Sequence, residues 1–241
     1  MAIIILDTET IGQKKEDDRI CELAFLVHTE DTGWEAFSDL AKNDMPISSN
    51  AMAVHHITHE MIEDALPLKR TPSFKMLEKL NRPDNILVIQ NAPFDLGVLA
   101  NHDFIWHGAV VDTLVCAKHL LSTQRHALQY LRYELGLYKE EKLIAEAMDV
   151  KIEAHRALGD VIVTKLLLNH LLAHVENNMD ALIELSNQPA LLKSIGFGKY
   201  RGQLFESVVP QDRDYFIWCL ENFAKLSKEA RTTIEYHLAQ V

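Results

Sequence analysis

Short apolar runs that end in polar residues recur along the first half of the chain and predict an α/β fold. The first run covers residues 3–6 and leads directly into Asp7-Thr8-Glu9. An unbroken apolar run is typical of a strand that is buried on both faces. Similar runs, together with the hairpin signal Asp-Thr-Gly at residues 31–33, predict further strands at residues 20–27, 34–40, 85–90 and 110–113.

Helical patterns fill the intervals between these strands and most of the remaining chain. Several starts carry a capping residue, such as Thr71 before Pro72, Asp212 and Ser227. We expect short helices within residues 48–64, a helix that begins at Pro93, and helices at residues 71–80, 113–121, 126–135, 161–174, 212–223 and 227–239.

The last quarter of the chain is predicted to be a separate unit. Gln188-Pro189 is the expected linker, which divides the chain into a domain of residues 1–187 and a C-terminal module of residues 188–241. Glycines that alternate with aromatic and basic residues at 195–205 favour a tight hairpin. With two helices after it, this hairpin predicts a small α+β module.

The composition is that of a globular protein and not of a membrane-spanning one. Of the 241 residues, 48% are hydrophobic and 24% are charged. No apolar stretch approaches the roughly 20 residues that cross a bilayer, and the acidic start lacks the basic segment of a signal peptide. We therefore expect a cytoplasmic protein without a membrane partner. Its three cysteines are far apart in apolar contexts, which favours buried, reduced thiols.

The net charge of −11 argues against binding nucleic acid by bulk electrostatic attraction. The charge is unevenly distributed, because residues 190–241 carry 7 Lys and Arg against 6 Asp and Glu. Part of the acidic excess elsewhere can be metal-binding carboxylates, and ordinary solvated acids are the common alternative.

Carboxylates stand at the ends of three predicted core elements. Side chains alternate along a strand, so Asp7 and Glu9 should point to one side of it. Asp95 lies in the first turn of a helix, and Asp160 lies at the start of the long helix if His155 precedes that helix. The simpler alternatives are a strand that ends in a polar turn, an acid that complements a helix dipole, and a structural histidine.

Such a group of acids predicts metal-dependent phosphodiester chemistry. Neighbouring carboxylates disfavour each other's ionisation unless a cation lies between them, and hard oxygen ligands suit Mg²⁺ or Mn²⁺. Two divalent cations can stabilise the attacking and leaving oxygens of a phosphoryl displacement. A neutral histidine close to them, here His155, can take the proton of the attacking water.

Three segments resemble, in order, the motifs of the DnaQ-like (DEDDh) 3′–5′ exonucleases. They are DTET at residues 7–10, NAPFD at residues 91–95 and HRALGD at residues 155–160. The segments AVHHIT at 53–58 and DTL at 112–114 are also similar to that family, although His56 stands where the family has glycine. The resemblance implies a ribonuclease H-like fold over about residues 1–175, with a mixed five-stranded sheet flanked by helices.

The resemblance also implies roles for individual residues. Two divalent cations would be held by four acids, with Asp7 as the bridge and His155 as the general base. These five catalytic residues are Asp7, Glu9, Asp95, His155 and Asp160. Thr8, Thr10, His55 and Asn91 would contact the substrate, although a helix-end cap is an alternative for His55. Phe94 is expected to pack beneath the site.

The C-terminal module is similar to that of the exonuclease X branch of this family. Lys199 and Arg201 on the predicted hairpin are expected to contact a phosphate backbone, whereas Phe197 and Trp218 are expected in a small core. The alternative leaves both cations solvated.

Taken together, the sequence predicts a 3′–5′ exonuclease that acts on nucleic acid, with DNA 3′ ends preferred over RNA. An exoribonuclease, a polymerase proofreading subunit and a binding module without catalysis remain alternatives. A nucleotide-binding α/β protein is disfavoured because no glycine-rich phosphate loop follows the first strand. The sequence does not determine the oligomeric state.

Overall fold

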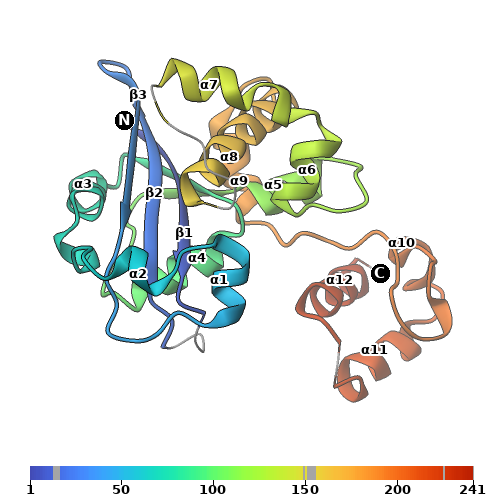
Figure 1. Ribbon diagram of the computed structural model, residues 1–241. Helices are drawn as coiled ribbons and strands as arrows, with labels where there is room; N and C mark the ends of the chain where they lie inside the picture. Colours follow the sequence, from blue (N-terminus) through green and yellow to red (C-terminus); the bar gives the residue numbers. More distant parts are fainter. Residues whose placement is uncertain (13–16, 149, 151–155, 225, 241) are drawn as a thin grey trace.

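A computed structural model describes residues 1–12, 17–148, 150, 156–224 and 226–240. Its strands form one mixed sheet in the order β3-β2-β1-β4-β5 (Figure 1). β2 pairs antiparallel with β1 and β3, whereas β1, β4 and β5 run parallel. The strands are β1 (Ile3–Thr10), β2 (Ile20–Thr29), β3 (Gly33–Leu40), β4 (Ile86–Ile89) and β5 (Ala109–Asp112). The predicted α/β fold with a mixed five-stranded sheet is confirmed.

Helices lie between β3 and β4 and between β4 and β5, and further helices follow β5. The first group is α1 (Ser49–His55), α2 (His59–Ile62), η1 (Leu68–Arg70), α3 (Pro72–Leu80), α4 (Ala92–Ala100), α5 (Thr113–Leu120) and α6 (Leu128–Glu134). The second group is η2 (Leu137–Lys139), α7 (Glu141–Ala147), α8 (Ala157–Ala173), α9 (Met179–Ser186), η3 (Gly198–Tyr200), α10 (Phe205–Val208), α11 (Arg213–Asn222) and α12 (Lys228–Ala239). No helix in the described part is long and apolar enough to cross a bilayer.

The sheet is buried on both faces because alternate residues of its strands face two different cores. One core joins Ile5 and Leu26 to α5, α6, α8 and α9. The other joins Leu6 and Phe25 to α3 and α4. Figure 1 shows α8 on one side of the sheet and α3 on the other. This two-sided burial explains why the strand sequences are continuous apolar runs.

Side-chain caps fix several helix starts where the sequence predicts them. Thr71 accepts a hydrogen bond from the backbone N–H of Phe74, and Ser227 accepts one from that of Ala230. The sequence patterns did not predict the helices α7, α9 and α10. The three cysteines are buried and unpaired, as expected.

The C-terminal helices enclose a small core of their own, whose buried members include Phe205, Phe216 and Ile234. Figure 1 shows α10, α11 and α12 gathered beyond an extended orange segment. Phe197 packs against this core as predicted. The prediction for Trp218 is wrong, because its side chain is 49% exposed and rests against Tyr215 on the outer surface of the module.

The predicted hairpin at residues 195–205 is replaced by a more helical arrangement. Gly198–Tyr200 forms the 3-10 turn η3, and a single antiparallel bridge joins Ser194 to Leu204. Gly198 has a φ of +60°, and Tyr215 closes over it, so glycine is required there. Within residues 188–224 and 226–240 this bridge is the only β pairing that the structure contains.

Candidate active site

Three carboxylates meet at the carboxyl end of β1. Asp7 and Glu9 lie on the same side of the strand, as alternation predicts, and Asp160 reaches them from the first turn of α8. One carboxylate oxygen from each of the three residues lies within 4.8 Å of the other two. All three side chains are partly buried. This grouping offers only oxygen ligands, which is the donor set that Mg²⁺ and Mn²⁺ prefer.

The electrostatics of this cluster favour a bound cation. Burial, together with the charges of Asp95, Asp160 and Glu9, raises the pKa of Asp7 well above its usual value. Burial and the nearby acids, Asp160 first among them, raise the pKa of Glu9 to about 8. Protonation relieves the repulsion between these acids when no metal is bound, and a divalent ion can relieve it with all of them ionised. The side chains therefore fit a metal site.

An ion pair between β2 and the start of α8 fixes the helix that carries Asp160. Glu22 is 1% exposed and lies directly opposite Glu9 on the neighbouring strand. Arg156 donates to Glu22 through Nη2 at 2.5 Å and through Nε at 3.0 Å to each carboxylate oxygen. The backbone N–H of Ala157 donates to the same carboxylate at 3.0 Å. These contacts attach the first turn of α8 to the sheet beside the acid cluster.

Sequence reasoning missed Glu22 and Arg156. A glutamate inside the apolar run of residues 20–27 was the available signal, because a charge buried in a strand requires a partner. A further partner was also missed: Gln129 on α6 donates to Oδ1 of Asp160 at 2.6 Å. Asp160 is therefore oriented by another helix as well as by its own.

Asp95 lies next to this cluster but bonds mainly to β1. Its buried Oδ1 accepts from the backbone N–H of Thr8 at 3.0 Å and from the Thr8 hydroxyl at 2.7 Å. Burial raises the pKa of Asp95 to about 7 in spite of these two hydrogen bonds. The Thr8 hydroxyl therefore helps to hold Asp95 in place, and Thr8 also lines the cleft beside the acids.

The turn before α4 is held by another buried carboxylate. Asp112, the N-cap of α5, accepts from the backbone N–H groups of Asn91 and Ala92, each at 3.1 Å. Asn91 has a φ of +69° and an exposed side chain. The left-handed turn at Asn91 and the bonds to Asp112 fix the direction in which α4 starts, and with it the position of Asp95.

A cleft of about 360 Å³ opens beside the acids. Glu9, Thr10 and His55 line it, and so does Phe94. The prediction that Phe94 packs beneath the site is wrong, since its side chain is 46% exposed. Successive helix residues are about 100° apart, so α4 directs Asp95 inward and Phe94 outward. Phe94 thus provides an exposed aromatic ring next to the acid cluster.

Thr10 and His55 form a buried support for the cleft. The Thr10 hydroxyl donates to Asp18 at 3.0 Å. Nδ1 of His55 accepts from the backbone N–H of Ile57 at 2.9 Å, so Nε2 carries the ring proton and donates to the Thr10 carbonyl at 3.1 Å. Burial lowers the pKa of His55, which keeps the ring neutral. Both ring nitrogens are engaged, which favours the structural alternative at the end of α1.

Two further predicted substrate contacts lie in the C-terminal module and do not line this cleft. Lys199 pairs with Asp212 at 2.6 Å, and its ammonium group lies over the rings of Tyr200 and Tyr215. Arg201 is exposed. The predicted general base, His155, lies outside the described residues.

Comparison with known proteins relates this chain to nucleases. The profile of the RNase T exonuclease family matches residues 4–168. The chain is 28% identical over 234 residues to exodeoxyribonuclease 10 of Escherichia coli K12, and the match covers 97% of each protein. It is 29% identical over 179 residues to DNA polymerase III subunit epsilon of Pasteurella multocida, covering 67% of the chain and 66% of that protein.

Two solved structures share the fold. Exonuclease X in complex with 5′ overhanging duplex DNA superposes with a TM-score of 0.57 at 22% identity, covering 77% of this chain and 99% of that one. A 3′-exonuclease that recognises a histone mRNA stem-loop superposes with a TM-score of 0.52 at 14% identity, covering 71% of this chain and 82% of that one.

Proposed function

The chain belongs to the RNase T exonuclease family, and we propose that it is a metal-dependent 3′–5′ exonuclease that releases nucleoside monophosphates from DNA. The observation that carries this proposal is the convergence of Asp7, Glu9 and Asp160 within 4.8 Å at one end of the sheet. Separate segments supply these acids, and their mutual repulsion makes a cation necessary when all of them are ionised.

In this proposal the acids hold two divalent cations, with Asp7 as the shared ligand. Bound ions would polarise the scissile phosphate and lower the pKa of the attacking water. Asp95 lies close enough to Asp7 to raise its pKa, and it would add negative charge for the second ion. His155 immediately precedes Arg156, which is attached to Glu22, and would accept the proton of the attacking water.

The cleft beside the acids suits the last nucleotide of a strand. The exposed ring of Phe94 is available to stack against a base, which is a contact that tolerates any sequence. Thr10 and His55 also line the cleft and are held in place by buried hydrogen bonds. Substrate contacts at Thr8, Asn91, Lys199 and Arg201 remain part of the proposal. For Lys199 a phosphate would have to compete with Asp212.

DNA is the favoured substrate because a relative that matches 97% of the chain is named an exodeoxyribonuclease. A second candidate, trimming of RNA 3′ ends, is favoured by the shared fold with a 3′-exonuclease that recognises histone mRNA. We also propose that residues 1–187 form the exonuclease domain and residues 188–241 a separate module, since the latter encloses its own core.

Release of label from 3′-labelled and 5′-labelled strands tests the function. In Mg²⁺ we expect the wild-type protein to release the 3′ label as a mononucleotide at once. The 5′ label should be released only at the end of digestion. Asp160→Ala should abolish release. Full activity of Asp160→Ala, or early loss of the 5′ label, would overturn the assignment. Single-stranded DNA, duplex DNA and RNA are compared side by side, and strict preference for RNA would reverse the substrate assignment.

A further inference from the structure

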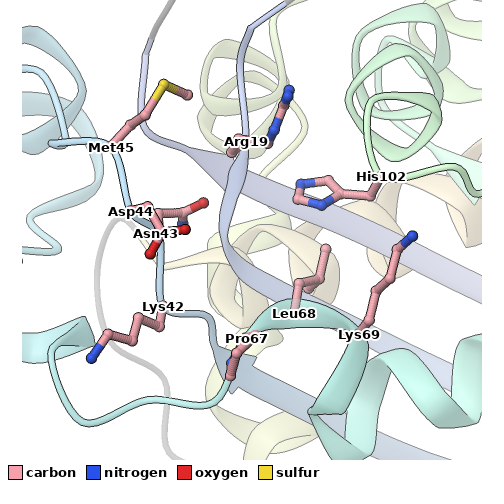
Figure 2. Close-up of a pocket in the computed structure, with 9 residues that line it drawn as sticks. All are labelled: Arg19, Lys42, Asn43, Asp44, Met45, Pro67, Leu68, Lys69 and His102. Carbon is pink, nitrogen blue, oxygen red and sulfur yellow. The ribbon is translucent and has the colours of Figure 1, made fainter.

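A second pocket, of about 450 Å³, is bordered by the side chains of Arg19, Lys69 and His102 (Figure 2). Arg19 precedes β2, Lys69 belongs to η1, and His102 follows α4. Ile20 and Leu68 beside it belong to the core under α3 and α4, whereas Asp7 and Glu9 face α8. The pocket and the cleft at the acids share no lining residue, so they are separate.

His102 presents a hydrogen-bond donor in a fixed tautomer. Its Nε2 lies 3.1 Å from the backbone nitrogen of Ile20 and accepts that N–H. The ring proton of the neutral imidazole is therefore on Nδ1. Burial, together with the charges of Arg19 and Lys69, lowers the pKa of His102 to about 4. The ring is consequently neutral at pH 7 and offers Nδ1–H as its remaining polar group.

Two cations close to this ring can turn toward an anion at small cost. Arg19 has five N–H donors and gives one to the Asp18 carbonyl at 2.9 Å. Lys69 pairs with Asp103 at 2.8 Å, but the two side chains are 53% and 89% exposed. An ion pair that exposed contributes little to stability, so Lys69 can exchange Asp103 for a ligand.

The polar groups that border the pocket are mainly donors, in a chain whose net charge is −11. Lys42 also lines it, although its ammonium group is turned to the Glu63 carbonyl at 2.7 Å. One acid, Asp44, reaches toward the pocket in Figure 2 and is exposed to solvent. Its carboxylate would repel a bound anion. Removing this charge should therefore strengthen anion binding, whereas removing a cation should weaken it.

We propose that Arg19, Lys69 and His102 form a phosphate-binding pocket. A tetrahedral phosphate accepts several hydrogen bonds at once, which matches donors that come from three segments. The segment 18–20 connects the pocket with the cleft, because Asp18 binds Thr10 and Ile20 binds His102. In the working enzyme the phosphate belongs to the nucleic-acid backbone away from the 3′ end, an assignment that rests on the proposed function.

The test combines binding of long DNA with turnover of a minimal substrate. Arg19→Met and Lys69→Met should each weaken binding of a labelled 20-mer in Ca²⁺ by roughly fivefold and reduce its salt dependence by about one unit of slope. Asp44→Asn should strengthen binding roughly twofold because it removes a repulsive charge. Hydrolysis of a dinucleotide in Mg²⁺ should be unchanged in all three variants. Lys75→Met, which removes an exposed lysine on α3, is the control and should bind as the wild-type protein does.

Titrations with inorganic phosphate and with thymidine monophosphate identify the source of the phosphate. In the wild-type protein both should shift the His102 side-chain resonances in ¹⁵N NMR spectra. Suppose that either ligand shifts these resonances, but Arg19→Met and Lys69→Met bind the 20-mer as the wild-type protein does. The pocket then binds free phosphate esters, and its assignment to the backbone is overturned. If neither ligand shifts the resonances and these variants bind the 20-mer as the wild-type protein does, the pocket does not bind phosphate and the proposal is overturned. If the wild-type protein hydrolyses no nucleic acid, the proposed function fails, and the NMR titration still decides whether phosphate binds.

Discussion

Removing one acid from the metal-free cluster should stabilise the protein while destroying its metal site. Glu9→Gln keeps the shape of the side chain and removes its charge. The pKa of Glu9 is raised from 4.5 to about 8, chiefly by burial and by Asp160. At about 1.4 kcal/mol per pKa unit, an ionised Glu9 lowers the free energy of unfolding by at most about 5 kcal/mol. We expect Glu9→Gln to recover about 1–3 kcal/mol of this, because Asp7 can hold a proton that the two acids share.

The size of this effect depends on pH. A carboxyl group whose folded-state pKa lies above its unfolded value binds more protons in the folded state, so stability falls as pH rises. For Glu9 this loss begins near pH 4.5 and is complete above about pH 8. Glu9→Gln should therefore match the wild-type protein at pH 4.5 and exceed it in stability at pH 8.

Urea unfolding in EDTA at the two pH values measures the difference, with Glu63→Gln as a control at an exposed glutamate. Addition of Mn²⁺ at pH 8 should stabilise the wild-type protein more than Glu9→Gln, because the ion needs the carboxylate. If Glu9→Gln is less stable than the wild-type protein at pH 8 without metal, the electrostatic account of the cluster is refuted.

Three other predictions follow from single contacts. His56→Gly should raise the free energy of unfolding by about 0.5–1 kcal/mol, since His56 has a φ of +59°, and an unchanged or lower value in urea titrations would contradict this. Arg156→Met should cost about 3 kcal/mol by leaving Glu22 buried without its partner, and Glu22→Gln in the same chain should recover part of that loss in a double-mutant cycle; strict additivity would exclude the coupling. Asp7→Asn should lower kcat about 100-fold more than Asp95→Asn does, because Asp7 belongs to the three-acid cluster whereas Asp95 bonds to Thr8, and equal losses would argue against a bridging role.

The parts of the fold that the sequence predicted are those encoded by local pattern. The apolar run before Asp7 specifies a central strand, and alternation along it places Asp7 and Glu9 on one side. Thr71 and Ser227 begin helices because their side chains cap backbone N–H groups a few residues away. Each of these features depends on neighbours in the sequence, so each can be deduced without coordinates.

The features that were missed depend on contacts between distant segments. Glu22 and Arg156 are 134 positions apart, and Thr8 and Asp95 are 87 apart. No local pattern states which partner a buried charge will find. Phe94 was misplaced for a related reason: the direction of its ring follows from the angle at which α4 leaves the sheet. That angle is fixed by the hydrogen bonds that the backbone N–H groups of Asn91 and Ala92 donate to Asp112, which lies at the end of the later strand β5.

Calorimetric titration with Mn²⁺ tests the central claim, that Asp7, Glu9 and Asp160 hold the catalytic metal, most directly. The wild-type protein at pH 8 should bind Mn²⁺, and Asp160→Asn should weaken binding at least tenfold while unfolding at no lower urea concentration in EDTA. The same variant should lose nucleotide release in parallel. Wild-type affinity for Mn²⁺ in folded Asp160→Asn would contradict the claim.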